Sequence, residues 1–159
     1  RRAAAETAVR IAEDRGWTDV RAGFAWRALG RLTLGHDRAA SRMAFARAAA
    51  IYSARPGLAL QAAHADMQLA AFALSDGDAQ TALDLTARAA PQAARAENAA
   101  LLASLLMVRS AALDLVGRAS EAQAVRIDSL AYARYGFASA AEVKARFANI
   151  AALSPVNRQ

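Results

Sequence analysis

Apolar residues recur every three or four positions along most of the chain, and short polar or glycine-containing segments interrupt this pattern. Spacing of this kind indicates amphipathic helices. Glycine after a periodic segment marks a helix end, and aspartate, serine or threonine before one marks an N-cap. On these signals we expect about eight helices, at residues 2–15, 19–34, 37–54, 57–74, 79–90, 92–116, 119–135 and 140–153.

Two of the expected helices, at 57–74 and 92–116, are apolar on almost every side. A helix of this kind is covered by neighbours on several faces. The first and last helices are more polar and would cap the ends of a stack. We therefore expect an all-α chain that forms one domain, with a capping helix at 1–18, helical hairpins at 19–56, 57–91 and 92–136, and a second capping helix at 137–159.

The three hairpin turns share a spacing of small residues. Their glycines are Gly35, Gly77 and Gly117, which lie 42 and 40 residues apart. Because small side chains let two helices approach closely, we expect the helices of each hairpin to cross at the small residues that flank these glycines. Five residues after each glycine stand Ala40, Ala82 and Ala122, and seven residues before stand Ala28, Ala70 and Ser110.

This arrangement resembles the tetratricopeptide repeat, a family with small residues at its eighth and twentieth positions and glycine near its fifteenth. Residues 63–96 match best, residues 103–136 match moderately and residues 21–56 match weakly, so the resemblance covers roughly residues 19–135. The spacing of about 40 residues exceeds the family's 34, and most of its large aromatic residues are missing. The best-matching positions are Leu69, Ala70, Gly77, Asp78, Ala82, Leu83 and Ala89.

The resemblance implies a right-handed stack of antiparallel hairpins with a concave groove that takes an extended peptide or a partner helix. Five residues of the helix at 57–74 are candidates for that groove. Gln61, His64 and Gln68 share one helix face by their spacing, and the repeat register adds Met67 and Leu74. The alternative is a narrow polar stripe on a buried helix, or a closed bundle without any groove.

The residue content of the chain excludes several kinds of functional site. The chain has no cysteine, so disulfides, thiolate metal sites and thiol nucleophiles are excluded. Its two histidines lack the partners of a metal site, and no nucleophile motif or phosphate-binding loop occurs. We expect no enzyme activity, no cofactor and no metal. The longest apolar run, 99–108, is about half the ~20 residues that a membrane-spanning helix needs, so no transmembrane segment is expected.

The net charge of +6 is confined to the first third of the chain. Residues 1–55 hold 11 arginines and 5 acidic residues, whereas residues 56–159 are balanced. Arg27 and Arg31 are one helical turn apart, as are Arg38 and Arg42 on the next helix. All four would converge if both pairs lie on facing sides, and arginine clusters suit carboxylates, phosphates or lipid headgroups. The alternative is that each arginine is solvated.

The leading hypothesis is a non-enzymatic protein–protein interaction or scaffold module, part of a larger bacterial assembly, that binds a protein or peptide. The alternatives are a nucleic-acid or anionic-surface binder that uses the basic first third, and a sensory or dimerisation domain of a regulator. The sequence leaves homo-oligomerisation open. Because the chain begins at Arg1, it also leaves open the bacterial cytoplasm and, if an upstream signal was removed, the periplasm.

Overall fold

The computed structural model describes residues 1–137, and all regular secondary structure in this range is helical. This confirms the all-α prediction. The helix expected at 140–153 lies outside the described residues. The helices are α1 (Arg2–Asp14), α2 (Val20–Thr33), α3 (Arg38–Ser53), the short 3-10 helix η1 (Pro56–Leu58), α4 (Ala59–Ser75), α5 (Ala79–Arg95), α6 (Ala99–Leu115) and α7 (Ala119–Tyr135).

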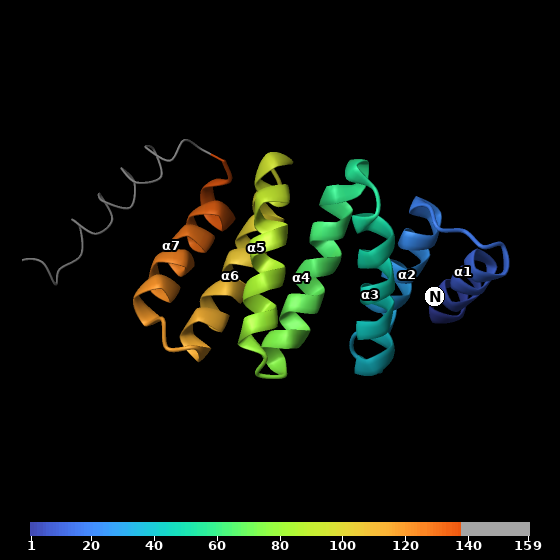
Figure 1. Cartoon of the computed structure of the whole chain (residues 1–159), viewed down its shortest axis with the longest axis horizontal. Helices are drawn as coiled ribbons and strands as arrows, with labels where there is room; N and C mark the ends of the chain where they lie inside the picture. Colours follow the sequence, from blue (N-terminus) through green and yellow to red (C-terminus); the bar gives the residue numbers. More distant parts are fainter. Residues whose placement is uncertain (138–159) are drawn as a thin grey trace, which may run out of the picture.

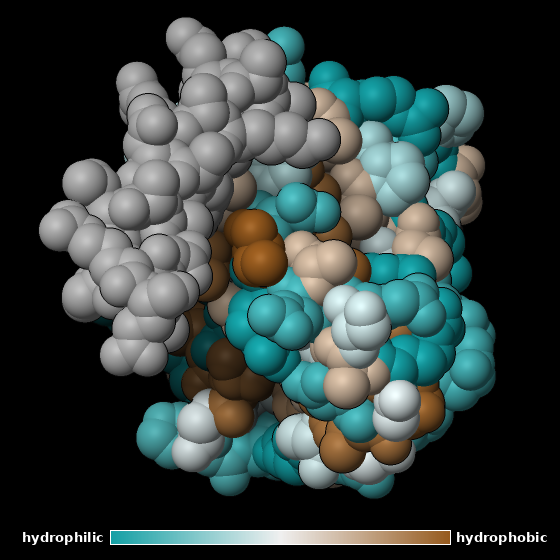
Figure 2. Space-filling view, turned by 90° about the vertical axis from the view of Figure 1, so that its left-hand side faces the viewer, coloured by the Kyte–Doolittle hydropathy of each residue, from teal (hydrophilic) through white to brown (hydrophobic). Residues whose placement is uncertain are grey.

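The helices stand side by side in sequence order, from α1 at one end of the molecule to α7 near the other (Figure 1). Each α-helix packs against the next one along the chain. Helix α4 also contacts α6, so α5 lies against both of them rather than between them. Seen from the α7 end, apolar surface occurs among hydrophilic residues (Figure 2), and Ile127 and Leu130 of α7 are both exposed.

Two of the predicted turns have the expected glycine conformation. Gly77 and Gly117 adopt positive φ angles of +79° and +76°, which an L side chain rarely adopts. Between α4 and α5, the Asp78 carboxylate accepts a hydrogen bond of 3.1 Å from the backbone N–H of Thr81. The glycine therefore ends one helix and the aspartate starts the next.

The break predicted at Pro91 is wrong, because α5 runs through Pro91 to Arg95. Proline lacks the N–H that would bond the carbonyl of Ala87, but both residues are exposed, so water can satisfy that carbonyl. The real turn lies at Glu97, whose φ is +50° although it is not glycine. Asn98 then caps α6, because its side chain accepts a hydrogen bond from the N–H of Leu101 at 3.0 Å.

At two of the three predicted crossings the small residues are buried, and at one of these a hydrogen bond joins them. Ala70 and Ala82 are fully buried, and the Ser110 hydroxyl donates to the Ala122 carbonyl at 2.8 Å. The first crossing was predicted at the wrong positions, because Ala28 is exposed.

Helices α2 and α3 cross instead at Gly30, whose carbonyl accepts a 2.7 Å hydrogen bond from the Ser41 hydroxyl. The Phe45 ring lies so close to Gly30 that an added β-carbon would come within 3.0 Å of it.

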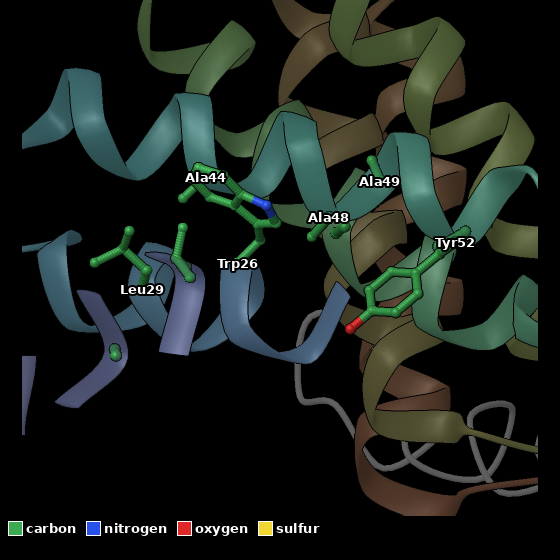
Figure 3. Packing of buried hydrophobic residues seen from close by; sticks show 10 residues of the cluster. Trp26, Leu29, Ala44, Ala48, Ala49 and Tyr52 are labelled. Carbon is green, nitrogen blue, oxygen red and sulfur yellow. The ribbon is translucent and has the colours of Figure 1, made fainter. Parts of the chain in front are cut away.

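Large side chains pack against alanine and glycine residues along the interface between α2 and α3. Trp26 of α2 lies against Ala44 and Ala48 of α3 (Figure 3). Further along the same interface the Tyr52 ring lies where a β-carbon at Gly23 would come within 2.4 Å of it. Tyr52 is fully buried, and its hydroxyl has no hydrogen-bond partner among the described residues.

Replacing Tyr52 by phenylalanine should therefore stabilise the chain. The substitution keeps the ring and removes a buried hydroxyl that has lost its bonds to water, so we expect a gain of about 1 kcal/mol in the free energy of unfolding. Urea denaturation followed by circular dichroism measures this change. Tyr132→Phe is the control, because Tyr132 is only half-buried and its substitution should change little. A destabilised Tyr52→Phe variant would contradict the assignment of an unpaired hydroxyl.

Candidate functional site

A pocket of about 460 Å³ lies between α2 and α4. Helix α2 and the residue that follows it contribute Arg27, Arg31 and Leu34, and the buried ring of Phe45 comes from α3. Helix α4 contributes His64 and Gln68. The structure thus brings together half of the predicted arginine patch and part of the predicted groove face, which sequence reasoning had treated as two separate sites. We call this site the α2–α4 pocket.

The two pocket arginines are one turn apart on α2 and share a face. The Arg27 guanidinium lies 5.1 Å from the centroid of the Phe24 ring, which is a cation–π distance. Neither Arg27 nor Arg31 forms an ion pair within residues 1–137. Their positive charge is therefore available to a negatively charged ligand.

Opposite the arginines, His64 and Gln68 are one turn apart on α4. Burial lowers the pKa of His64 below its ordinary value of 6.5, and the nearby charge of Arg27 lowers it further. The imidazole is therefore neutral at pH 7. Within residues 1–137 the Gln68 amide nitrogen reaches only the Met67 sulfur, at 3.8 Å, and a thioether is a weak acceptor. Both side chains can still hydrogen-bond a ligand.

Arg38 and Arg42 do not line the α2–α4 pocket. Both bind Asp76 at the end of α4, Arg42 at 2.8 Å. Arg38 also donates to the Ser75 hydroxyl at 2.6 Å and lies over the Phe72 ring. The predicted convergence of four arginines is thus corrected to two pairs. The partner of the second pair is an acidic residue of this same chain, so Arg38 and Arg42 join α3 to α4.

The other predicted groove residues lie outside the pocket lining. Met67 packs against the buried cluster that contains Ala63 and Leu105, and Leu74 packs against the cluster shared by α5, α6 and α7. Gln61 is half-buried on α4. Sequence reasoning missed Leu34 and Phe45, because their place beside the pocket depends on how α3 packs between α2 and α4.

A second, smaller pocket of about 180 Å³ lies beside the α3–α4 connection and α5. Its polar lining includes Asp66, whose side chain is 3% exposed, and Arg88. The Arg88 guanidinium donates two hydrogen bonds to the Asp66 carboxylate, at 2.9 and 2.7 Å. Because Arg88 and Asp66 already bind each other, this pocket has fewer free polar groups for a ligand than the α2–α4 pocket has.

The described part of the chain, residues 1–137, shows neither a metal cluster nor a membrane-spanning helix. No three histidine, cysteine, aspartate or glutamate side chains come close enough there to hold a metal ion. No described helix combines the length and the apolar character that crossing a membrane requires.

Comparison of the chain with protein-family models, with curated proteins and with solved structures finds no match. The chemistry that the α2–α4 pocket can support is therefore inferred from its own geometry. Two fixed positive charges, a neutral imidazole, an amide and two apolar side chains suit the binding of an anionic, partly apolar ligand.

Proposed function

We propose that this chain is a non-enzymatic protein–protein interaction module that binds a segment of a partner protein in the α2–α4 pocket. In this proposal the helices form a tetratricopeptide-like, right-handed stack of hairpins, and the pocket is part of its concave face. The observation that carries the proposal is the pocket itself. Helices α2 and α4 supply four polar side chains to it. Within the described chain these side chains form no ion pair, and their one side-chain hydrogen bond is the weak contact of Gln68 with the Met67 sulfur.

Pocket dimensions support a peptide ligand. A volume of about 460 Å³ accommodates a few side chains rather than a whole folded domain. The exposed Leu34 and the buried Phe45 ring offer apolar contacts beside the arginines. A peptide that alternates polar and apolar side chains could use both kinds of contact at once.

Nucleic acid or another anionic surface is the second candidate, because Arg27 and Arg31 would suit a phosphate equally well. Four other arginines of the basic first third argue against it. Arg2 pairs with Glu6, Arg21 pairs with Asp19, and Arg38 and Arg42 share Asp76. These pairs interrupt the continuous basic track that a phosphate backbone follows.

Selection from a random 12-residue peptide library displayed on phage tests the proposed function. Affinities of the selected peptides are then measured by fluorescence anisotropy for the wild type and for an Arg27→Ala/Arg31→Ala variant. We expect at least a tenfold loss of affinity in this variant, because charge-assisted hydrogen bonds are worth about 1.5–3 kcal/mol each.

The matched control is Arg10→Ala/Arg47→Ala, which removes the same charge from two exposed positions outside the pocket. Its affinity should stay within about twofold of the wild type, since exposed charges contribute little at physiological salt. Equal losses in both variants would show that the peptides respond to overall charge and not to the pocket. If no peptide is selected and single-stranded DNA binds in a steeply salt-dependent manner, the protein-binding proposal is wrong.

A further inference from the structure

The α2–α4 pocket combines fixed positive charges with a titratable histidine, which is kept neutral first by burial and second by the charge of Arg27. Arg27 and Arg31 stand on one wall and His64 on the other. Arg27 is the charged residue whose field acts on His64. A negative group that binds between them would cancel that field and favour a protonated imidazole.

The other elements packed against α4 bring no unpaired charge toward His64, so Arg27 is the main charged group that acts on its pKa. On α3, burial raises the pKa of the Tyr52 phenol, so it stays uncharged at neutral pH. Arg38 and Arg42 of the same helix are bound to Asp76 at the end of α4. On α5, Arg88 is bound to Asp66 of α4. On α6, Arg109 donates to the Leu83 carbonyl and Asp114 binds Arg126 of α7. The segment η1 has no charged residue.

We propose that the α2–α4 pocket receives a carboxylate side chain of an acidic partner peptide, and that His64 takes up a proton when this carboxylate enters. The inference rests on the proposed function and specifies the chemistry of its ligand. The carboxylate accepts hydrogen bonds from the guanidinium of Arg27 or Arg31 and from the new N–H of His64. The proton comes from solvent, so binding becomes tighter as the pH falls.

An acidic peptide fits the pocket better than a nucleic acid does. Leu34 and Phe45 give the site an apolar side that a peptide can use, and a phosphate backbone would require more arginines in line with Arg27 and Arg31. Among residues 1–137, Arg27 and Arg31 are the two arginines that line the pocket, since Arg38 and Arg42 are held by Asp76.

Linkage fixes the sign of the pH dependence. In the unliganded protein His64 is neutral above its lowered pKa. An opposite charge nearby typically raises a histidine pKa by about 1–2 units, and each unit corresponds to a tenfold gain in affinity at low pH. Lowering the pH from 8 to 6 should therefore tighten binding, by at most about tenfold for each unit by which the bound carboxylate raises this pKa. Glutamate side chains and arginines do not titrate in this range.

The probe is a soluble 12-residue peptide in which glutamate alternates with serine around one leucine. Its control is the same peptide with glutamine in place of every glutamate. Isothermal titration calorimetry at pH 7 in HEPES and in Tris buffer, which differ in ionisation enthalpy, measures the number of protons taken up. We expect uptake of part of one proton by the wild type, none by the His64→Gln variant, and at least tenfold weaker binding of the glutamine peptide.

Imidazole NMR provides a second readout that does not depend on affinity. The chain has only two histidines, so the His64→Gln variant identifies the His64 resonance. The midpoint of the pH titration of this resonance should move to higher pH when the glutamate peptide is bound. Affinity that is independent of pH in both proteins, or a His64 midpoint that does not move, would overturn the inference.

The outcomes separate this inference from the proposed function. If library-selected peptides bind through Arg27 and Arg31 but glutamate and glutamine peptides bind equally, the carboxylate assignment is wrong and the interaction module stands. If a 20-residue oligothymidylate displaces the glutamate peptide and binds more tightly without proton uptake, the pocket is a nucleic-acid site and the carboxylate inference is wrong.

Discussion

Replacing Leu105 by alanine is expected to destabilise the chain by about 3–4 kcal/mol, within the range for leucine-to-alanine substitutions in cores. Leu105 is fully buried and belongs to a cluster with Ala63 of α4 and Ala89 and Ala93 of α5. Leucine and methionine side chains also border this cluster and can relax into part of the cavity, so we expect a cost in the middle of that range. Urea unfolding followed by circular dichroism measures the change in the free energy of unfolding.

Leu115→Ala on the same helix is the matched control. Leu115 is 59% exposed, so the same chemical change there should cost less than about 0.5 kcal/mol. A loss at Leu105 no larger than the loss at Leu115 would mean that α6 does not pack against α4 and α5 as described.

The second large effect is expected at the Asp66–Arg88 pair. Arg88→Ala leaves the Asp66 carboxylate buried without its two charge-assisted hydrogen bonds. Removing one partner of a fully buried pair costs about 3–5 kcal/mol, and because the Arg88 side chain is 60% exposed we expect about 2–3 kcal/mol. Thermal or urea unfolding of the single variant measures this cost.

Asp66→Asn in the Arg88→Ala background separates the charge from the packing. It keeps the shape of the side chain and removes the unpaired negative charge, so the double variant should recover part of the lost stability. A double variant less stable than Arg88→Ala alone would show that the buried charge is not the source of the loss.

Local signals in the sequence were sufficient to locate most of the helices. Gly77 with Asp78, and Gly117, end one helix and allow the next to begin through interactions within a few residues. The Pro91 break was predicted wrongly because proline's effect depends on whether the orphaned carbonyl can reach water. Asn98 is a good N-cap and could have placed the start of α6, but the positive φ at Glu97 has no signal in residue type.

The α2–α4 pocket was only half predictable, because it depends on contacts between distant segments. Helical spacing places Arg27 beside Arg31 and His64 near Gln68, and both relationships hold. Nothing in the spacing shows that these two pairs line the same pocket, or that Asp76 occupies Arg38 and Arg42. Helices α2 and α3 also cross at Gly30 and Ser41 rather than at Ala28 and Ala40. The Phe45 ring lies so close to Gly30 that a side chain there would clash with it.

Backbone amide NMR during titration with the glutamate peptide tests the central claim, that the α2–α4 pocket is where a partner segment binds. We expect the largest chemical-shift changes on α2 around Arg27 and Arg31 and on α4 around His64 and Gln68, and their loss in the Arg27→Ala/Arg31→Ala variant. Shift changes centred on Arg38, Arg42 and Asp76 or on the exposed face of α7, with the pocket residues unchanged, would contradict the claim.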